Sequence, residues 1–170
     1  LDSGVWASSK FLSEEILKGT VTIPMVENIG KSLAKMHQLT RKASLTDRQF
    51  AQLKHVFGPR MKSLVSARVF NIPFTGPGLN YMHPDVKAKA DRLIWKNNQI
   101  KAEVARLKNI FDTQEECLIG GNLSPTSTLM KNGTAHIYDT QFAGTGPAAF
   151  DVASYVSYFM MAYYHHMLIP

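Results

Sequence analysis

The dipeptide Asn132-Gly133 constrains the fold of this chain more than any other feature of its sequence. It separates two short segments, 127–131 and 134–139, and Asn-Gly between strand-like segments is a strong local signal for a β-hairpin. The longer segments before it repeat apolar residues at three- and four-residue steps, which is typical of amphipathic helices. The sequence therefore predicts helices, a small hairpin and a final helix, which is a mainly helical α+β fold.

The helix boundaries are predicted from local signals. Pro24 and Pro84 suit the first turn of a helix, and Thr46 followed by Gln49 resembles a capping box. The predicted helices are 24–39, one beginning at Thr46, 59–69, one beginning at Pro84, 95–111 and 147–165, with a loop at 71–83. The last helix is apolar nearly all round, so we expect it to be buried.

Bulk properties limit the class of protein. The chain has 170 residues, of which 45% are hydrophobic, and this is enough for one domain with a core. It contains no apolar run long enough to span a membrane. The single cysteine, Cys117, excludes an internal disulfide and favours a reducing compartment. We therefore expect an intracellular protein of the cytoplasm or of an organelle such as the mitochondrion.

Positive charge is concentrated in one part of the chain, whose net charge is +6. Residues 31–68 carry a single acid, Asp47, and nine basic residues, which are Lys31, Lys35, Arg41, Lys42, Arg48, Lys54, Arg60, Lys62 and Arg68. Such an imbalance predicts docking on RNA or on an acidic protein surface. The alternative is a set of ordinary solvated helix faces.

Three motifs occur in order in the last third of the chain. They are the loop 120–127, GGNLSPTS, then Asp139-Thr140-Gln141 after the hairpin, and then the segment 142–154, FAGTGPAAFDVAS. They resemble the C-terminal lobe of the methylthioribose kinase family, a group of kinase-like small-molecule phosphotransferases. The family motifs read H-G-D-L-H-x-G-S, D-P-E and F-A-x-x-G-P-x-x-F-D-I-G. Segments 10–37 and 93–123 resemble the same lobe, so the likeness covers most of the chain.

The resemblance implies a domain organisation. Residues 1–170 would form a single kinase-like C-terminal lobe, without the N-terminal lobe that covers ATP in this family and without the family's last helices. We find no glycine-rich phosphate loop in the sequence. Asp151 matches an aspartate that braces the catalytic loop in the family, and we expect it to keep that role.

The resemblance also implies that the reactive positions have changed. Asn122 stands where the family has the aspartate that accepts the substrate's proton, and Gly120 and Ser124 replace two histidines. Asp139 matches the first metal-binding carboxylate, whereas Gln141 replaces the second. Because an amide cannot act as a base, these changes predict an inactive kinase-like domain with no catalytic residue, cofactor or metal.

Such a pseudoenzyme would act as a structural subunit that binds other proteins, with RNA as the other candidate partner. The alternative is a divergent methylthioribose kinase-type phosphotransferase that uses ATP and Mg²⁺. Asp139 could then hold a metal, since Mg²⁺ is often bound by one or two carboxylates together with phosphates.

Overall fold

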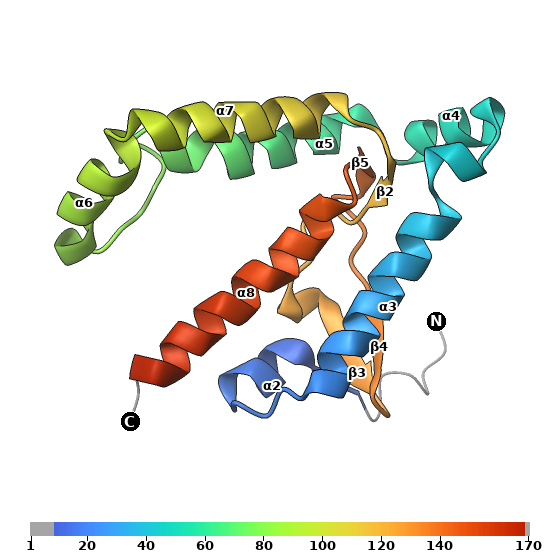
Figure 1. Ribbon diagram of the computed structural model, residues 1–170, viewed down its shortest axis with the longest axis horizontal. Helices are drawn as coiled ribbons and strands as arrows, with labels where there is room; N and C mark the ends of the chain where they lie inside the picture. The colour runs from blue at the N-terminus through green and yellow to red at the C-terminus, as the bar shows by residue number, and fades with distance from the viewer. Residues whose placement is uncertain (1–8, 169–170) are drawn as a thin grey trace.

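The computed structural model describes residues 9–168, which form a mainly helical α+β fold as predicted (Figure 1). The seven α-helices of this part are α2 (Leu12–Leu17), α3 (Ile23–Leu39), α4 (Asp47–Val56), α5 (Pro59–Ser66), α6 (Pro84–Ala90), α7 (Asn98–Thr113) and α8 (Ala149–Leu168). The strands are β1 (Lys10–Phe11), β2 (Cys117–Ile119), β3 (Thr128–Lys131), β4 (Thr134–Ile137) and β5 (Gly144–Gly146). Residues 1–8 and 169–170 lie outside the described part.

The predicted hairpin is confirmed. Strands β3 and β4 pair antiparallel, with Lys131 opposite Thr134. Asn132 and Gly133 form the two-residue turn with φ values of +50° and +76°, the combination that a type I′ turn requires. Strand β1 adds to the other edge of β3, a pairing that the sequence analysis did not predict.

A second sheet consists of β2 and β5, in which Cys117 faces Gly146 and Ile119 faces Gly144. Strand β5 was not predicted, because glycine is depleted in strands. Its glycines permit close approach to β2: a Cβ on Gly146 would lie 2.5 Å from Cδ1 of Ile119. This sheet brings residues 144–146 beside the strand that leads into the loop 120–127.

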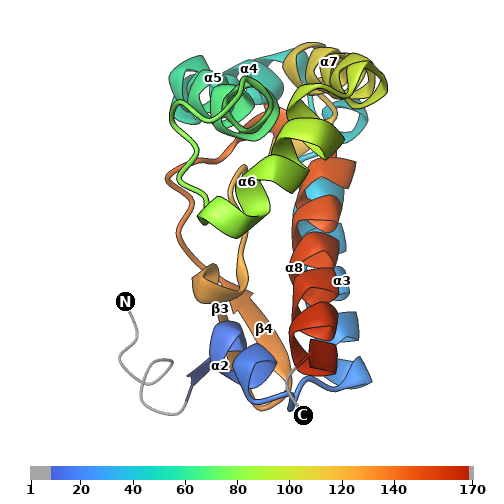
Figure 2. The same ribbon diagram turned by 90° about the vertical axis from the view of Figure 1, so that its left-hand side faces the viewer.

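The helices form two groups. Helices α5 and α7 lie side by side and lead to α6, whereas α3 and α8 contact each other beside the hairpin (Figures 1 and 2). The capping box that begins α4 is present, since the side chain of Thr46 accepts from Gln49 N and Gln49 Oε1 accepts from Thr46 N. Helix α5 ends at Ser66 and continues as π-helical turns over Ala67–Asn71, rather than as α-helix to Val69.

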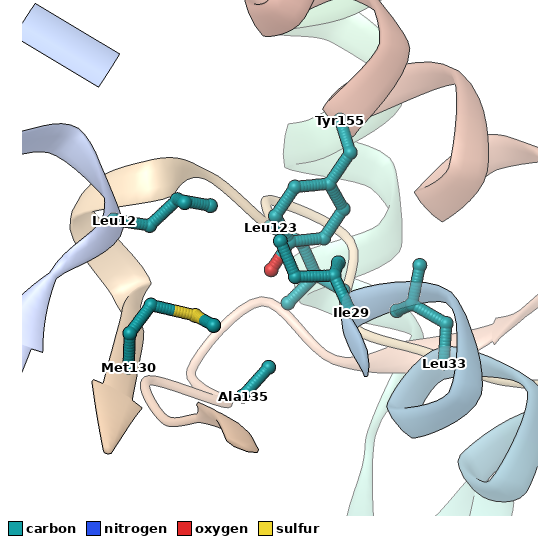
Figure 3. Packing of buried hydrophobic residues seen from close by; sticks show 7 residues of the cluster. All are labelled: Leu12, Ile29, Leu33, Leu123, Met130, Ala135 and Tyr155. Carbon is teal, nitrogen blue, oxygen red and sulfur yellow. The ribbon is translucent and has the colours of Figure 1, made fainter. Parts of the chain in front are cut away.

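Two hydrophobic clusters hold these groups together. Figure 3 shows the first, in which side chains from α2, α3, α8, the hairpin and the preceding loop converge: Leu12, Ile29, Leu33, Leu123, Met130, Ala135 and Tyr155. The second contains Val65, Phe111, Cys117 and Ile119. Because Ile119 lies in one cluster and Leu123 in the other, the loop residues 120–122 are anchored at both ends.

The prediction that the last helix is buried is wrong. Among the described residues of α8, only Asp151 and Tyr155 are buried, whereas Val152, Val156 and Met160 are about half exposed. Helix α8 contacts α2 and α3, and its first turn packs through Phe150 on Phe70 and Phe111, but these contacts leave much of its length uncovered. No helix in the part of the chain that the structure describes is long and apolar enough to cross a membrane.

Candidate functional site

Asp151, in the first turn of α8, holds the loop that follows β2. The Asp151 side chain is fully buried. Its Oδ2 accepts the N–H of Gly120 at 2.9 Å, and its Oδ1 accepts the N–H of Gly121 at 3.3 Å. A buried carboxylate is costly unless hydrogen bonds satisfy it, and the loop amides supply such bonds. The position of the loop is therefore coupled to the first turn of α8.

A residue that the sequence analysis missed completes this arrangement. His37, near the end of α3, lies with Nε2 3.0 Å from Oδ2 of Asp151, and the ring donates because the carboxylate can only accept. The two residues are separated by 114 positions, so no local pattern pairs them. In the sequence, only the helical spacing that predicts α3 includes His37, and this spacing does not indicate Asp151 as its partner.

The loop also contacts the segment that follows Gln141. Gly121 has φ +74°, and a Cβ there would lie 2.1 Å from the carbonyl oxygen of Phe142. Only glycine fits both the left-handed backbone and this close approach. Together with the β2–β5 pairing, this contact places the loop of Asn122 beside the end of segment 139–141.

Asp139 follows β4 in an uncommon conformation. Its φ is +63°, in the left-handed region that Asp adopts more readily than most residues. Its side chain is exposed, and the side-chain amide of Gln141 lies 3.5 Å from its Oδ2. The Asp139 carboxylate is thus accessible, with the amide nitrogen of Gln141 beside it. The described residues contain no cluster of three or more His, Cys, Asp or Glu side chains that could hold a metal.

Two other changed positions in the loop have structural roles. A Cβ on Gly120 would lie 2.2 Å from Cδ2 of the buried Leu123, so Leu123 occupies the space that a larger residue at position 120 would need. Ser124 belongs to a buried hydroxyl network, in which Ser127 Oγ donates to the Ser124 carbonyl oxygen at 2.9 Å. Both residues therefore stabilise the turn that leads into β3.

Asn122 itself is exposed at the edge of a cavity of about 520 Å³. The cavity lies between α7, the π-helical turns and α8, and its wall is mainly apolar. Its lining includes Phe70, Leu107, Ile110, Phe111, Phe150 and Ala153. The site thus combines the amide of Asn122, the nearby segment 139–141 with its Asp139 carboxylate, and an apolar cavity.

The nine basic residues of 31–68 are not gathered into this site. Four of them have partners within the chain: Lys31 pairs with Glu27, Lys54 pairs with Glu115, and Lys42 and Lys62 lie over the rings of Phe50 and Phe111. Burial lowers the pKa of Lys62, against the opposing charges of Glu115 and Asp112. The other five, Lys35, Arg41, Arg48, Arg60 and Arg68, are exposed. Docking through these residues stays a prediction.

Comparison with known proteins supports the resemblance. No protein-family model matches the chain. Curated relatives do match, and they are methylthioribose kinases from Exiguobacterium sibiricum (27% identical over 150 residues, 88% of this chain and 38% of the relative) and Bacillus cereus (29% over 132 residues, 77% and 33%). The enzyme of that name from Bacillus thuringiensis is 28% identical over 132 residues. The chain resembles the methylthioribose kinases. It spans about a third of the length of these methylthioribose kinases.

This resemblance corrects two predictions. The relatives are named as kinases, which conflicts with the predictions that the chain is not an enzyme and has no cofactor. Kinases transfer phosphate from ATP with Mg²⁺, and they do so mainly by positioning and charge neutralisation. Those predictions rested on the changes at Gly120, Asn122, Ser124 and Gln141 and on the expected absence of the nucleotide-binding lobe. The resemblance to a methylthioribose kinase-type lobe, by contrast, is confirmed.

Proposed function

We propose that this chain is the acceptor-binding C-terminal lobe of a small-molecule phosphotransferase of the methylthioribose kinase type, acting with ATP and Mg²⁺. Because the chain spans about a third of its curated relatives, the activity of the whole enzyme is part of this proposal. So is the assignment of residues 1–170 to a single lobe. The acceptor would be methylthioribose or a related small polyol.

One observation carries the proposal. The loop of Asn122 is held by the buried Asp151 carboxylate through the N–H groups of Gly120 and Gly121, and it presents Asn122 at the mouth of a cavity. A catalytic loop needs such rigid support, because small displacements of a reacting group are costly to the rate. The combination of a braced loop and an adjacent cavity supports acceptor binding at this point.

Asn122 would orient the acceptor hydroxyl rather than deprotonate it. Its side-chain oxygen can accept a hydrogen bond from that hydroxyl, whereas its amide has no basic atom at neutral pH. Phosphoryl transfer passes through a loose transition state in which positioning matters more than a base. We therefore expect a slower reaction than an aspartate would give, with the acceptor still held in place.

Asp139 is the residue that fits a magnesium ion. Its carboxylate is exposed, and the side-chain amide of Gln141 lies beside it. Mg²⁺ is commonly bound by one or two carboxylates together with substrate phosphates, so one carboxylate meets the minimum. A bound Mg²⁺ would neutralise charge on the phosphates. The φ of +63° at Asp139 turns the chain sharply after β4, beside the segment that contacts the loop.

The test is Mg²⁺-dependent release of ADP when the chain, joined to the nucleotide-binding part of the Bacillus cereus relative, is given ATP and methylthioribose. We expect release that requires methylthioribose, and an Asp139→Asn variant should lose most of it. Asp85→Asn, a change at a carboxylate that is 87% exposed, is the matched control and should be unaffected. ADP release that does not require methylthioribose would contradict the proposal. So would ADP release that is unchanged in the Asp139→Asn variant.

A second and separate candidate role is docking of RNA on the basic region. It is favoured by the exposure of Lys35, Arg41, Arg48, Arg60 and Arg68. Contacts to phosphates predict that affinity falls steeply with salt concentration. Failure to bind a single-stranded RNA at 50 mM salt would exclude this role. Binding whose affinity does not change with salt concentration would also exclude it.

A further inference from the structure

Leu79 and Tyr81 are the two most exposed large apolar side chains of the described residues. Leu79 is 83% exposed and Tyr81 is fully exposed. Both lie in the loop 75–83, which joins the short turn Ile72–Phe74 to α6. Helix α6 lies at one extremity of the molecule, at the end of α7 opposite to α4 (Figure 1). Packing inside the chain therefore explains neither residue, and their position allows both to meet a partner.

Hydrogen bonds hold the loop that carries these two residues. Asn80, which lies between them in the sequence, donates from Nδ2 to the carbonyl oxygens of Ile72 and Gly76 at 2.7 and 2.6 Å. Buried Trp95 donates from Nε1 to the carbonyl oxygen of Pro73 at 3.0 Å. The loop thus presents its exposed apolar side chains from a folded support, which lowers the entropic cost of binding a partner.

The helix that follows the loop carries unpaired positive charge. Helix α6 and its π-helical continuation Asp91–Trp95 hold exposed cations that have no carboxylate partner among the described residues, namely Lys87, Lys89 and Arg92. The two acids of this segment already have partners. Asp91 pairs with Lys96, and Oδ2 of Asp85 lies 3.3 Å from Nδ1 of His83. The three cations are therefore available to an anionic surface.

Apolar and basic side chains share this part of the surface. Leu79, Tyr81 and Lys87 line one pocket of about 420 Å³, and Val86 and Leu93 on the following helix are about half exposed. Apolar side chains flanked by Lys and Arg are typical of proteins that bind at the surface of an anionic membrane, and tyrosine favours the level of the headgroups. Nucleic acids are instead bound by several stacking rings, whereas the exposed apolar side chains here are mainly aliphatic.

We propose that the loop 75–83 and the helix after it form a docking surface for an anionic membrane. The apolar side chains of Leu79 and Tyr81 enter the boundary between headgroups and acyl chains. The cations contact the lipid phosphates and carboxylates, and they are Lys87, Lys89 and Arg92. The inference does not rest on phosphotransfer, because none of these residues belongs to the candidate site.

Vesicle sedimentation with the full chain, without nucleotide, tests this. Vesicles of one third phosphatidylserine in phosphatidylcholine should bind the chain, and vesicles of phosphatidylcholine alone should bind it far more weakly. Replacing Lys87, Lys89 and Arg92 together by Gln should weaken binding about 100-fold, since each basic residue near an anionic membrane contributes about fivefold. Leu79→Ser together with Tyr81→Ser should weaken it about tenfold or more. No binding to the phosphatidylserine vesicles would overturn the proposal.

Matched variants elsewhere separate this surface from the overall positive charge of the chain. Lys35→Gln, Arg41→Gln and Arg48→Gln together remove the same charge from exposed positions of the basic region, and Leu39→Ser removes an apolar side chain that is also largely exposed. Both should weaken vesicle binding far less than the corresponding changes at the docking surface. Equal effects at the two places would mean that net charge alone attracts the chain, and would overturn the proposal.

A fluorescent label locates the contact with the membrane. The single cysteine, Cys117, is buried, so a polarity-sensitive dye can be attached selectively to a Leu79→Cys variant. Its emission should shift to the blue when phosphatidylserine vesicles are added, and the same dye on a Leu39→Cys variant should not respond. An unchanged spectrum at position 79 would overturn the proposal. Binding to single-stranded RNA but not to vesicles, if the triple Gln change in the helix abolishes it, would assign the surface to nucleic acid and overturn it too.

Discussion

The Nε2 atom of His37 lies 3.0 Å from Oδ2 of Asp151, and this contact joins α3 to the base of the loop that carries Asn122. The same carboxylate accepts the N–H groups of Gly120 and Gly121. One buried side chain therefore connects three segments that are far apart in the sequence. Both the stability of the fold and the position of the loop should depend on it.

Replacing Asp151 with Asn should destabilise the chain. The amide nitrogen would face hydrogen-bond donors, and bonds to a charged acceptor are worth about 1.5–3 kcal/mol each, so we expect a loss of about 2–3 kcal/mol. Urea unfolding followed by circular dichroism measures this as a lower midpoint with an unchanged slope. Glu27→Gln, at an exposed carboxylate, is the control. An equal, small effect of both changes would mean that Asp151 does not hold the loop.

At His37, the stability of the chain should depend on the side-chain hydrogen-bond donor and not on the imidazole ring as such. His37→Gln keeps a side-chain N–H near the place of Nε2, whereas His37→Leu leaves Asp151 with one partner fewer. Oδ2 of Asp151 keeps the N–H of Gly120 in the Leu variant, so the loss is that of one hydrogen bond to a charged acceptor, and the Leu variant should be less stable by about 1.5–3 kcal/mol. Hydrogen exchange at the Gly120 amide should also be faster in the Leu variant. Equal exchange rates in the two variants would contradict this account.

The loop is adapted to glycine at position 120. A Cβ there would lie within 2.2–2.8 Å of three side-chain atoms of Leu123, and overpacking of a core typically costs about 1–3 kcal/mol. Gly120→Ala should therefore destabilise the chain by about that amount. In the Leu123→Ala background the same change should cost much less, because the clashing atoms are gone. A double-mutant cycle measures this coupling, and additive effects would refute it.

The thiol of Cys117 should be unreactive in the folded chain. Burial raises its pKa from 9.0 to about 11, with Asp151 adding to the effect. Only the thiolate reacts with iodoacetamide, so the folded chain should be alkylated slowly at pH 8 and the urea-unfolded chain quickly. Because the folded pKa is the higher one, the thiol's contribution to stability is present below pH 9 and is lost as the pH rises to about 11. Equally fast alkylation of the folded chain would contradict this prediction.

Features set by a few neighbouring residues were predictable from the sequence. The turn at Asn132-Gly133 and the capping box of Thr46 and Gln49 depend on local chemistry, and both occur as predicted. Helix α3 begins at Ile23, one residue before the predicted Pro24. These signals act within a few residues, so long-range packing does not override them.

Features that depend on distant partners were not predictable. Strand β5 forms because it pairs with β2. His37 supports the loop only because folding brings Asp151 within hydrogen-bond distance of it. The exposure of Val152 and Val156 likewise depends on which helices pack against α8. The family resemblance indicated the loop and Asp139, whereas the cavity beside Asn122 required the arrangement of α7 and α8 in space.

The most direct test of the phosphotransferase account is restoration of the base at Asn122. Phosphorus NMR would follow formation of methylthioribose phosphate from ATP and Mg²⁺ by the chain joined to the relative's nucleotide-binding part, with Asn122 and with Asn122→Asp. The account predicts product with both, formed on the order of 100-fold faster by the Asp variant, since general-base catalysis contributes about 10²–10⁴-fold. No product with either variant, in a protein that folds, would contradict it.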